Sequence, residues 1–154
     1  MTEKDRLEYA KSCLDRFVEV YKARLGVWTV MAVATTTLTG FGVQFKQPVF
    51  FAMAGLCPLI LLLLDYLIKR HYAAPFLYVG VKLEYQILGA ESAALLFIGN
   101  TFERAAFYRA SLGTKDEEER QRRFVNAYVS NGAWQKIVIC AGATGLELLL
   151  AWRL

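Results

Sequence analysis

Two long uncharged stretches, separated by a single lysine, are the strongest feature of the hydrophobic pattern. Residues 25–45 and 47–64 contain no charged side chain, and Lys46 lies between them. At about 1.5 Å of rise per helical residue, each stretch spans roughly 27 to 32 Å, close to the hydrocarbon thickness of a bilayer. Because proline is tolerated at the first position of a helix, Pro48 favours a tight turn at this point. The pattern therefore predicts a transmembrane helical hairpin over residues 25–68 with its tip at Lys46.

The chain before the hairpin, residues 1–24, has the rhythm of an amphipathic helix. Apolar side chains recur there at intervals of three and four residues, with charged residues between them. They are Leu7, Ala10, Leu14, Phe17, Val18 and Tyr21. Thr2 followed by Asp5 resembles a capping box, which predicts a helix that begins near Thr2. We expect this helix to be cytoplasmic and to continue without a break into the first crossing.

The basic residues around the hairpin indicate its orientation. Lys22 and Arg24 precede it, Lys69 and Arg70 follow it, and the tip carries only Lys46. Since short cytoplasmic flanks are enriched in Lys and Arg, both ends of the hairpin are expected to be cytoplasmic.

The region after the hairpin, residues 69–133, mixes apolar and polar positions and contains no uncharged run long enough to span a bilayer. It is expected to form cytoplasmic helices. The last of these begins in a highly charged segment, with Thr114 or Asp116 as its N-cap.

The C-terminal segment, residues 134–154, is apolar but short. Its core, residues 137–152, would span roughly 24 Å as a helix and contains Glu147. A third crossing, an interfacial helix and a helix packed against the hairpin are all compatible with this pattern. If the segment spans the bilayer, Glu147 must be paired or line water; at the surface it would face solvent. The predicted fold class is an all-α integral membrane protein with this segment as a possible third crossing.

Composition excludes several functional classes. The chain is 56% hydrophobic, and its 18 Lys and Arg are scattered among 14 Asp and Glu, which gives no basic patch for direct nucleic-acid binding. No glycine-rich phosphate loop is present. The three cysteines lack paired metal-ligand spacing, and His71 is the single histidine. We therefore expect a non-enzymatic protein with no catalytic residue, no metal site and no cofactor.

The first crossing carries small and hydroxyl-bearing residues. Such residues favour either close packing against another helix or a surface that lines a water-filled path. They are Thr29, Ala32, Thr35, Thr36, Thr39 and Gly40. Small residues let helix backbones approach each other, and packing is the commoner use of such a pattern. The alternative is that these residues line a hydrated path in an oligomer.

Asp65 lies at the end of the second crossing, where a carboxylate is costly enough to need a partner. Arg24, Lys22 and Lys69 are the candidates, and a pair with the first helix would clamp or gate the hairpin. The plainer interpretation is that Asp65 lies at the membrane interface and faces lipid headgroups or water. Arg70 and His71 are expected to meet anionic lipid headgroups.

The order of these features resembles a known class of proteins. The segment YKARLGVWTV enters the first crossing, and LLLLDYLIKRHYAAPFLYVGVKLE leaves the second. The pattern resembles small bacterial two-transmembrane proteins of antiphage systems, which include retron and CBASS-type membrane effectors and the SLATT class. The likeness covers about residues 10–90. The C-terminal segment is a departure from the two-crossing pattern.

This resemblance implies an oligomer in the bacterial inner membrane, with a cytoplasmic N-terminus, that disrupts or depolarises the bilayer when a soluble sensor triggers it. Its expected partners are the lipid bilayer, further copies of the chain and that trigger protein. The main alternative is a membrane-anchored scaffold that recruits a soluble partner through residues 72–133. A lipid-modifying enzyme ranks third, because the sequence offers no recognisable nucleophile and base.

Overall fold

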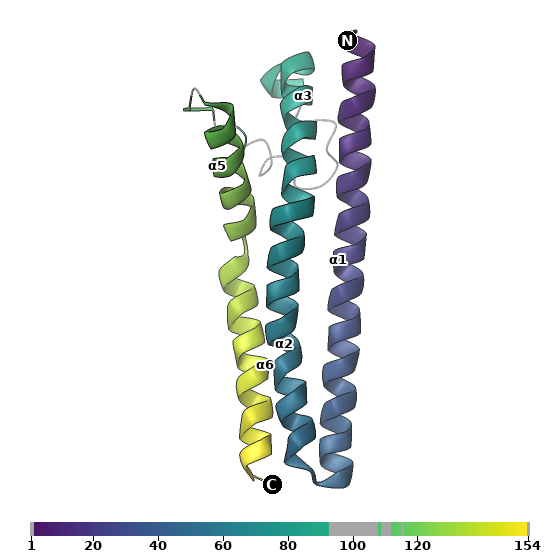
Figure 1. The fold of residues 1–154 in the computed structure, drawn as a ribbon, viewed down its shortest axis with the longest axis vertical. Coiled ribbons are helices and arrows are strands. Elements are labelled where there is room, and N and C mark those ends of the chain that lie inside the picture. Colours follow the sequence, from purple (N-terminus) through teal and green to yellow (C-terminus); the bar gives the residue numbers. More distant parts are fainter. Residues whose placement is uncertain (1, 93–107, 109–111, 115, 154) are drawn as a thin grey trace. The chain divides into compact units, whose positions relative to one another are not determined.

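The computed structural model describes residues 2–92, 108, 112–114 and 116–153, and the regular elements within them are helices (Figure 1). In chain order these are α1 (Glu3–Phe45), α2 (Pro48–Ile68), the π-helix η1 (Lys69–Ala73), α3 (Ala74–Ser92), α5 (Glu117–Ser130) and α6 (Ala133–Arg153). The predicted all-α fold class is confirmed.

Three stretches of helix among the described residues are long and apolar enough to cross a membrane. They are Glu3–Phe45, the continuous stretch Pro48–Ile87 and Ala133–Arg153. The stretch Pro48–Ile87 has 40 residues and would be about 60 Å long, roughly twice the hydrocarbon thickness, so only its apolar first half fits within a bilayer. The third stretch has 21 residues, which is enough to span. The chain is thus a membrane protein whose C-terminal helix is also a candidate crossing.

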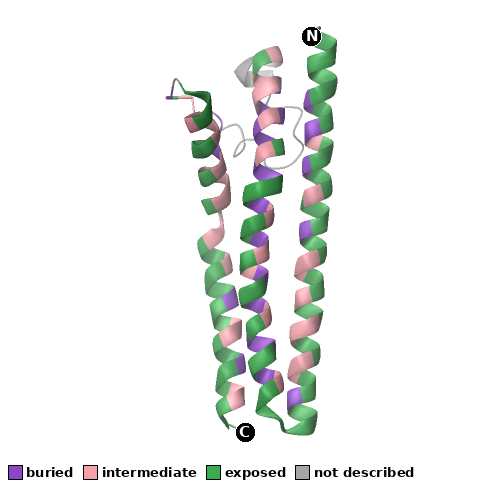
Figure 2. Cartoon of the chain, viewed as in Figure 1, coloured by how far each residue is buried: buried purple, intermediate pink, exposed green. Residues whose placement is uncertain are grey.

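Contacts divide the chain into two compact units. We name the first, Met1–Tyr21 with Ile68–Asn131, the amphipathic unit. The second, Lys22–Leu67 with Gly132–Leu154, is the apolar unit. Much of the surface of α6 and of the apolar parts of α1 and α2 is exposed in the isolated chain (Figure 2), as expected for helices that face lipid.

The amphipathic unit has a small core formed by aromatic and aliphatic side chains. Its buried members are Phe17, Ala73, Leu77, Tyr78, Val81, Tyr108 and Phe124. A Cβ added to Gly80 would lie 2.6 Å from Leu14, so glycine allows α3 to approach α1 closely.

The buried face of α1 in the amphipathic unit differs from the predicted one. Ala10 and Phe17 are buried as expected, and Cys13 joins them, whereas Leu7 and Val18 are 42% and 46% exposed. The predicted face was too wide because the contacting surface is centred on Ala10, Cys13 and Phe17, with Leu14 packed at its edge.

Local capping signals are confirmed at both α1 and α5. Thr2 and Asp5 exchange hydrogen bonds, from Thr2 N to Asp5 Oδ2 at 2.8 Å and from Asp5 N to Thr2 Oγ1 at 3.2 Å. At α5 the cap is Asp116, whose carboxylate accepts from Glu118 N at 3.2 Å. Each side chain satisfies a helix-end amide that would otherwise lack a partner.

The hairpin turn also follows its sequence signals. Lys46 has a φ of 53°, in the left-handed region, and Pro48 begins α2 as predicted. A Cβ added to Gly42 would lie 2.6 Å from the Phe51 ring, so glycine lets the two helices pack closely beside the turn.

Candidate functional site: two buried carboxyl groups of the apolar unit

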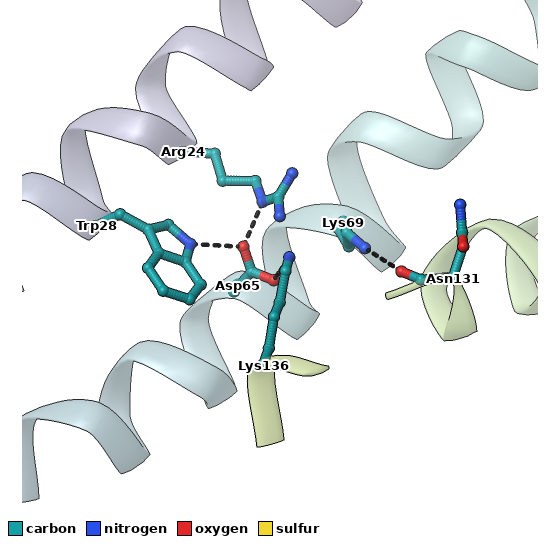
Figure 3. Close-up of polar contacts among 6 residues, drawn as sticks. All are labelled: Arg24, Trp28, Asp65, Lys69, Asn131 and Lys136. Carbon is teal, nitrogen blue, oxygen red and sulfur yellow. Dashed lines mark hydrogen bonds and ion pairs between the residues drawn. The ribbon is translucent and has the colours of Figure 1, made fainter. Parts of the chain in front are cut away.

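Asp65 is the centre of a polar cluster that joins all three helices of the apolar unit (Figure 3). Its side chain is 5% exposed, and it forms ion pairs with Arg24 of α1 and Lys136 of α6. Arg24 Nε donates to Asp65 Oδ1, and Lys136 Nζ donates to Oδ2 at 2.7 Å. Trp28 Nε1 adds a third donor, 2.9 Å from Oδ1. Three donors, two of them cationic, allow this carboxylate to be buried in its charged form.

Arg24 was one of the candidate partners of Asp65, whereas Lys136 and Trp28 were missed by sequence reasoning. The Lys136 ammonium also lies 5.5 Å from the centroid of the Trp28 ring, within the range of a cation–π contact. One signal could have identified Lys136: it is the charged residue that begins the C-terminal apolar segment. Because Asp65 pairs with Lys136 inside the bundle, the charge of Lys136 does not argue against α6 as a membrane crossing.

Lys69, a second candidate partner, belongs to the amphipathic unit. Its Nζ donates to the backbone oxygen of Asn131 at 3.1 Å (Figure 3) and lies 5.4 Å from the centroid of the Tyr128 ring. The residue is 6% exposed, so its ammonium is held among protein groups. The remaining candidate, Lys22, is exposed.

Glu147 of α6 is the second buried carboxyl group of the apolar unit and is 6% exposed. Its Oε1 lies 2.7 Å from the Thr39 hydroxyl of α1. Its Oε2 is buried and has no hydrogen-bond partner among the described residues. A Cβ added to Gly55 of α2 would lie 3.5 Å from the Glu147 Cβ, and Thr144 Oγ1 donates to the Gly55 oxygen at 3.0 Å. These contacts join α6 to both helices of the hairpin.

Four hydroxyl groups of the first crossing are bonded to its own backbone. Thr29, Thr35, Thr36 and Thr39 each donate to the carbonyl four residues earlier, at 2.8 to 3.1 Å. Thr35 and Thr39 are half-buried. On the adjoining side of the helix, Ala32, Thr36 and Gly40 are exposed, and nothing lies within 4 Å of a Cβ added to Gly40. The small-residue stripe is therefore packed at Thr39 and exposed at Ala32, Thr36 and Gly40.

Arg70 and His71, the predicted headgroup residues, lie in η1 and are exposed. Both line a cavity of about 480 Å³ in the amphipathic unit, together with residues from the start of α5 such as Asp116 and Glu119. Their contact with lipid stays a prediction.

A larger cavity in the amphipathic unit has a volume of about 880 Å³ and includes Arg6, Tyr9, Lys82 and Glu117 among its lining residues. Glu117 Oε1 accepts from Lys82 Nζ at 2.5 Å and from the Tyr78 hydroxyl at 2.9 Å. The Lys82 hydrogen bond is the main reason why the pKa of Glu117 lies below its usual value. The cavity thus combines paired charges with aromatic walls.

These features define an all-α membrane protein in which two buried carboxyl groups connect three candidate membrane-spanning helices. Comparisons with protein-family models, with curated proteins and with solved structures found no match to this chain.

Proposed function

We propose that this chain is an effector of the bacterial inner membrane that self-associates and depolarises the bilayer, and that it acts in antiphage defence. The observation that carries this proposal is the small-residue stripe of α1, which is only partly covered. One edge is occupied within the chain by the contact between Thr39 and Glu147, while Ala32, Thr36 and Gly40 are exposed. Small residues that face lipid are well suited to contact a helix of another copy.

The buried carboxyl groups are a second argument against a passive anchor. Burying ionisable groups within a membrane bundle is costly and is typical of functional sites. An anchor needs only apolar helices, yet α2 and α6 each bury an acid, Asp65 and Glu147. In this proposal Asp65 and its partner Arg24 form the gate, and the hydroxylated faces of α1 border the conducting path in the oligomer.

Induced expression in bacteria carrying a potential-sensitive dye tests the proposal. The wild-type chain should depolarise the membrane, and Gly40→Leu should reduce this effect because leucine would separate helices that meet at the exposed small face. The matched control is Val30→Leu, at a position that is 65% exposed on another side of α1. Unchanged membrane potential with the wild-type chain, in the presence of its native trigger, would refute the depolarising function.

The defence role has its own test. Cells that express the chain together with its neighbouring genes should survive as a population when challenged with phage at low multiplicity, and cells that carry Gly40→Leu should not. Equal plaque numbers with and without the wild-type chain would refute the antiphage role but not the depolarising function.

A membrane-anchored scaffold is the second candidate, and the cavity of about 880 Å³ in the amphipathic unit favours it. That volume is within the range of binding sites, and Tyr9 contributes an exposed aromatic wall. Purification in mild detergent distinguishes the two functions. A stoichiometric soluble companion that is lost in Tyr9→Ala would favour the scaffold, whereas a homomeric assembly would favour the effector.

A further inference from the structure

The part of α1 that belongs to the amphipathic unit carries a second row of side chains at intervals of three and four residues. We call it the outer stripe, and its members are Lys4, Leu7, Lys11, Leu14 and Val18. Leu7 and Val18 are 42% and 46% exposed, both lysines are exposed, and Leu14 is half-buried. Alternating intervals of three and four place all five on one side of a helix, as at the a and d positions of a coiled coil. The outer stripe thus has the geometry of a helix-pairing surface, and most of it is not covered within the chain.

The N-terminal part of the outer stripe lies beyond the reach of lipid. The uncharged run of α1 begins at Leu25, and Leu7 lies 18 residues earlier on the same continuous helix. That separation is about 27 Å along the helix axis, whereas the headgroup layer adds only roughly 5 to 8 Å on each side of the hydrocarbon core. A tilt of about 40° would still leave Leu7 outside the headgroups. Of the two surroundings that could cover the whole stripe, a bilayer and another protein surface, only the protein surface fits.

The charged residues of this surface alternate in sign along the helix. Lys4 and Lys11 lie within the outer stripe, and Glu8 and Asp15 lie beside it, each four residues after one of the lysines. All four are exposed, and none of them belongs to an ion pair among the described residues. Two positive and two negative charges in alternation make the surface complementary to a parallel copy of itself, because a lysine of one helix can lie beside an acid of the other.

The outer stripe also continues along α1 toward the exposed part of the small-residue stripe. Leu25 and Ala32 follow Val18 at intervals of seven residues, and both are exposed. Positions seven residues apart lie on nearly the same side of a helix. A single pair of α1 helices can therefore use both surfaces.

We propose that the outer stripe is an interface between copies of this chain, in which α1 packs parallel to α1 of a second copy. Copies that are inserted in one bilayer with the same orientation have parallel α1 helices, so equal positions face each other across the pair. Leu7 and Val18 then meet their counterparts, and Lys11 lies beside Glu8 or Asp15 of the second copy. The inference rests on the proposed self-association and gives it a contact surface outside the bilayer.

Cross-linking of the full-length chain in membranes of bacteria that express it tests the contact. Val18→Cys places a thiol in the outer stripe, where a short bismaleimide can join two copies, and denaturing electrophoresis detects the dimer. The matched control is Arg16→Cys, because the Arg16 side chain is 67% exposed but lies about 200° around the helix from Val18. The wild-type chain, with Cys13, Cys57 and Cys140, gives the background. The dimer in Val18→Cys should exceed that in Arg16→Cys by about tenfold, since only a stripe position faces its counterpart. Mass spectrometry identifies the link between the two residues at position 18.

Exchange of charges tests the pairing between the two copies. The double substitution Lys4→Glu with Lys11→Glu makes the four charged positions all acidic, and Glu8→Lys with Asp15→Lys makes them all basic. The four positions are exposed, so both variants should fold. In the Val18→Cys background each variant alone should give about fivefold less dimer than its parent, because like charges then face each other across an exposed contact. Co-expression of the two variants with different tags should restore the dimer in its mixed form.

Three results would each overturn the interface: equal dimer in Val18→Cys and Arg16→Cys, undiminished dimer in the two charge variants, or no gain on their co-expression. A cross-link from position 18 to a different protein would assign the stripe to another partner and would equally overturn it. Membrane potential in the same cells, with the native trigger present, separates this inference from the proposed function. Depolarisation without the dimer linked at position 18 would overturn the interface alone. The dimer without depolarisation would support the interface and refute the depolarising function.

Discussion

Asp65 and Glu147 are both acids buried in the apolar unit, yet their surroundings differ in kind. Asp65 accepts hydrogen bonds from Arg24, Lys136 and Trp28. Glu147 meets only the Thr39 hydroxyl, and its Oε2 has no partner among the residues that the structure describes. The two sites differ because charged partners are available only near the ends of the apolar segments.

The distance along α6 explains this difference. Glu147 lies eleven residues after Lys136, about 16 Å further along the helix. At the Asp65 level two cations offset a buried charge, whereas at the Glu147 level the sequence supplies hydroxyl groups and glycine. One acid is therefore held by cations and the other by uncharged groups.

The largest predicted effect is at Asp65. Asp65→Leu leaves Arg24 and Lys136 without their carboxylate in a buried site, and it should lower the free energy of unfolding in mixed micelles by about 3–5 kcal/mol. Asp65→Asn keeps the shape of the side chain and one acceptor oxygen, so it should lower the free energy of unfolding by a smaller amount. If Asp65→Leu is as stable as the wild-type chain, the charge of Asp65 does not hold the three helices together.

The next largest effect should come from single cations. Arg24→Met should lower the free energy of unfolding by about 1.5–3 kcal/mol, the range for a hydrogen bond to a charged group. Lys136→Met should lower it by less, since the Lys136 side chain is 21% exposed and that of Arg24 is 11% exposed. Lys22→Met is the matched control, because Lys22 is exposed. A loss in the control as large as that in Arg24→Met would argue against a specific pair.

An exposed carboxylate should show a smaller and pH-dependent effect. Because hydrogen bonding to Lys82 lowers the pKa of Glu117 from its ordinary value of 4.5, the pair stabilises the folded amphipathic unit above pH 4.5. This stability is lost as the pH falls through the lowered pKa of the folded state. The Glu117 side chain is 51% exposed, so the change should be only about 0.5 kcal/mol. Acid titration of the unfolding free energy should be flatter in Glu117→Gln, and identical curves would contradict the prediction.

The smallest effect on stability is expected at Glu147, which sharpens the contrast with Asp65. Glu147→Gln keeps the shape of the side chain and an oxygen that can accept from the Thr39 hydroxyl, so the free energy of unfolding should change by less than about 0.5 kcal/mol. Unfolding in mixed micelles measures this change, and a loss as large as that of Asp65→Leu would remove the contrast.

Much of the local structure was predictable because its causes are local. The cap formed by Thr2 and Asp5, the start of α2 at Pro48 and the cap at Asp116 depend on residues close together in the chain. The uncharged runs likewise predict membrane crossings from length and hydropathy alone. The C-terminal segment was ambiguous because its apolar core is short and because Glu147 counts against a crossing when it is considered without a partner.

Sequence by itself determined the hairpin, the helical fold class and the presence of an acid at the end of the second crossing. Tertiary structure decided which groups these acids meet: Lys136 is 71 residues from Asp65, and Thr39 is 108 residues from Glu147. Such contacts depend on how helices are rotated and aligned along one another, which is set by packing at close approaches such as Gly42 with Phe51 and Gly55 with Glu147. No local pattern encodes that alignment, so the partners of the two acids could be distinguished only in the folded chain.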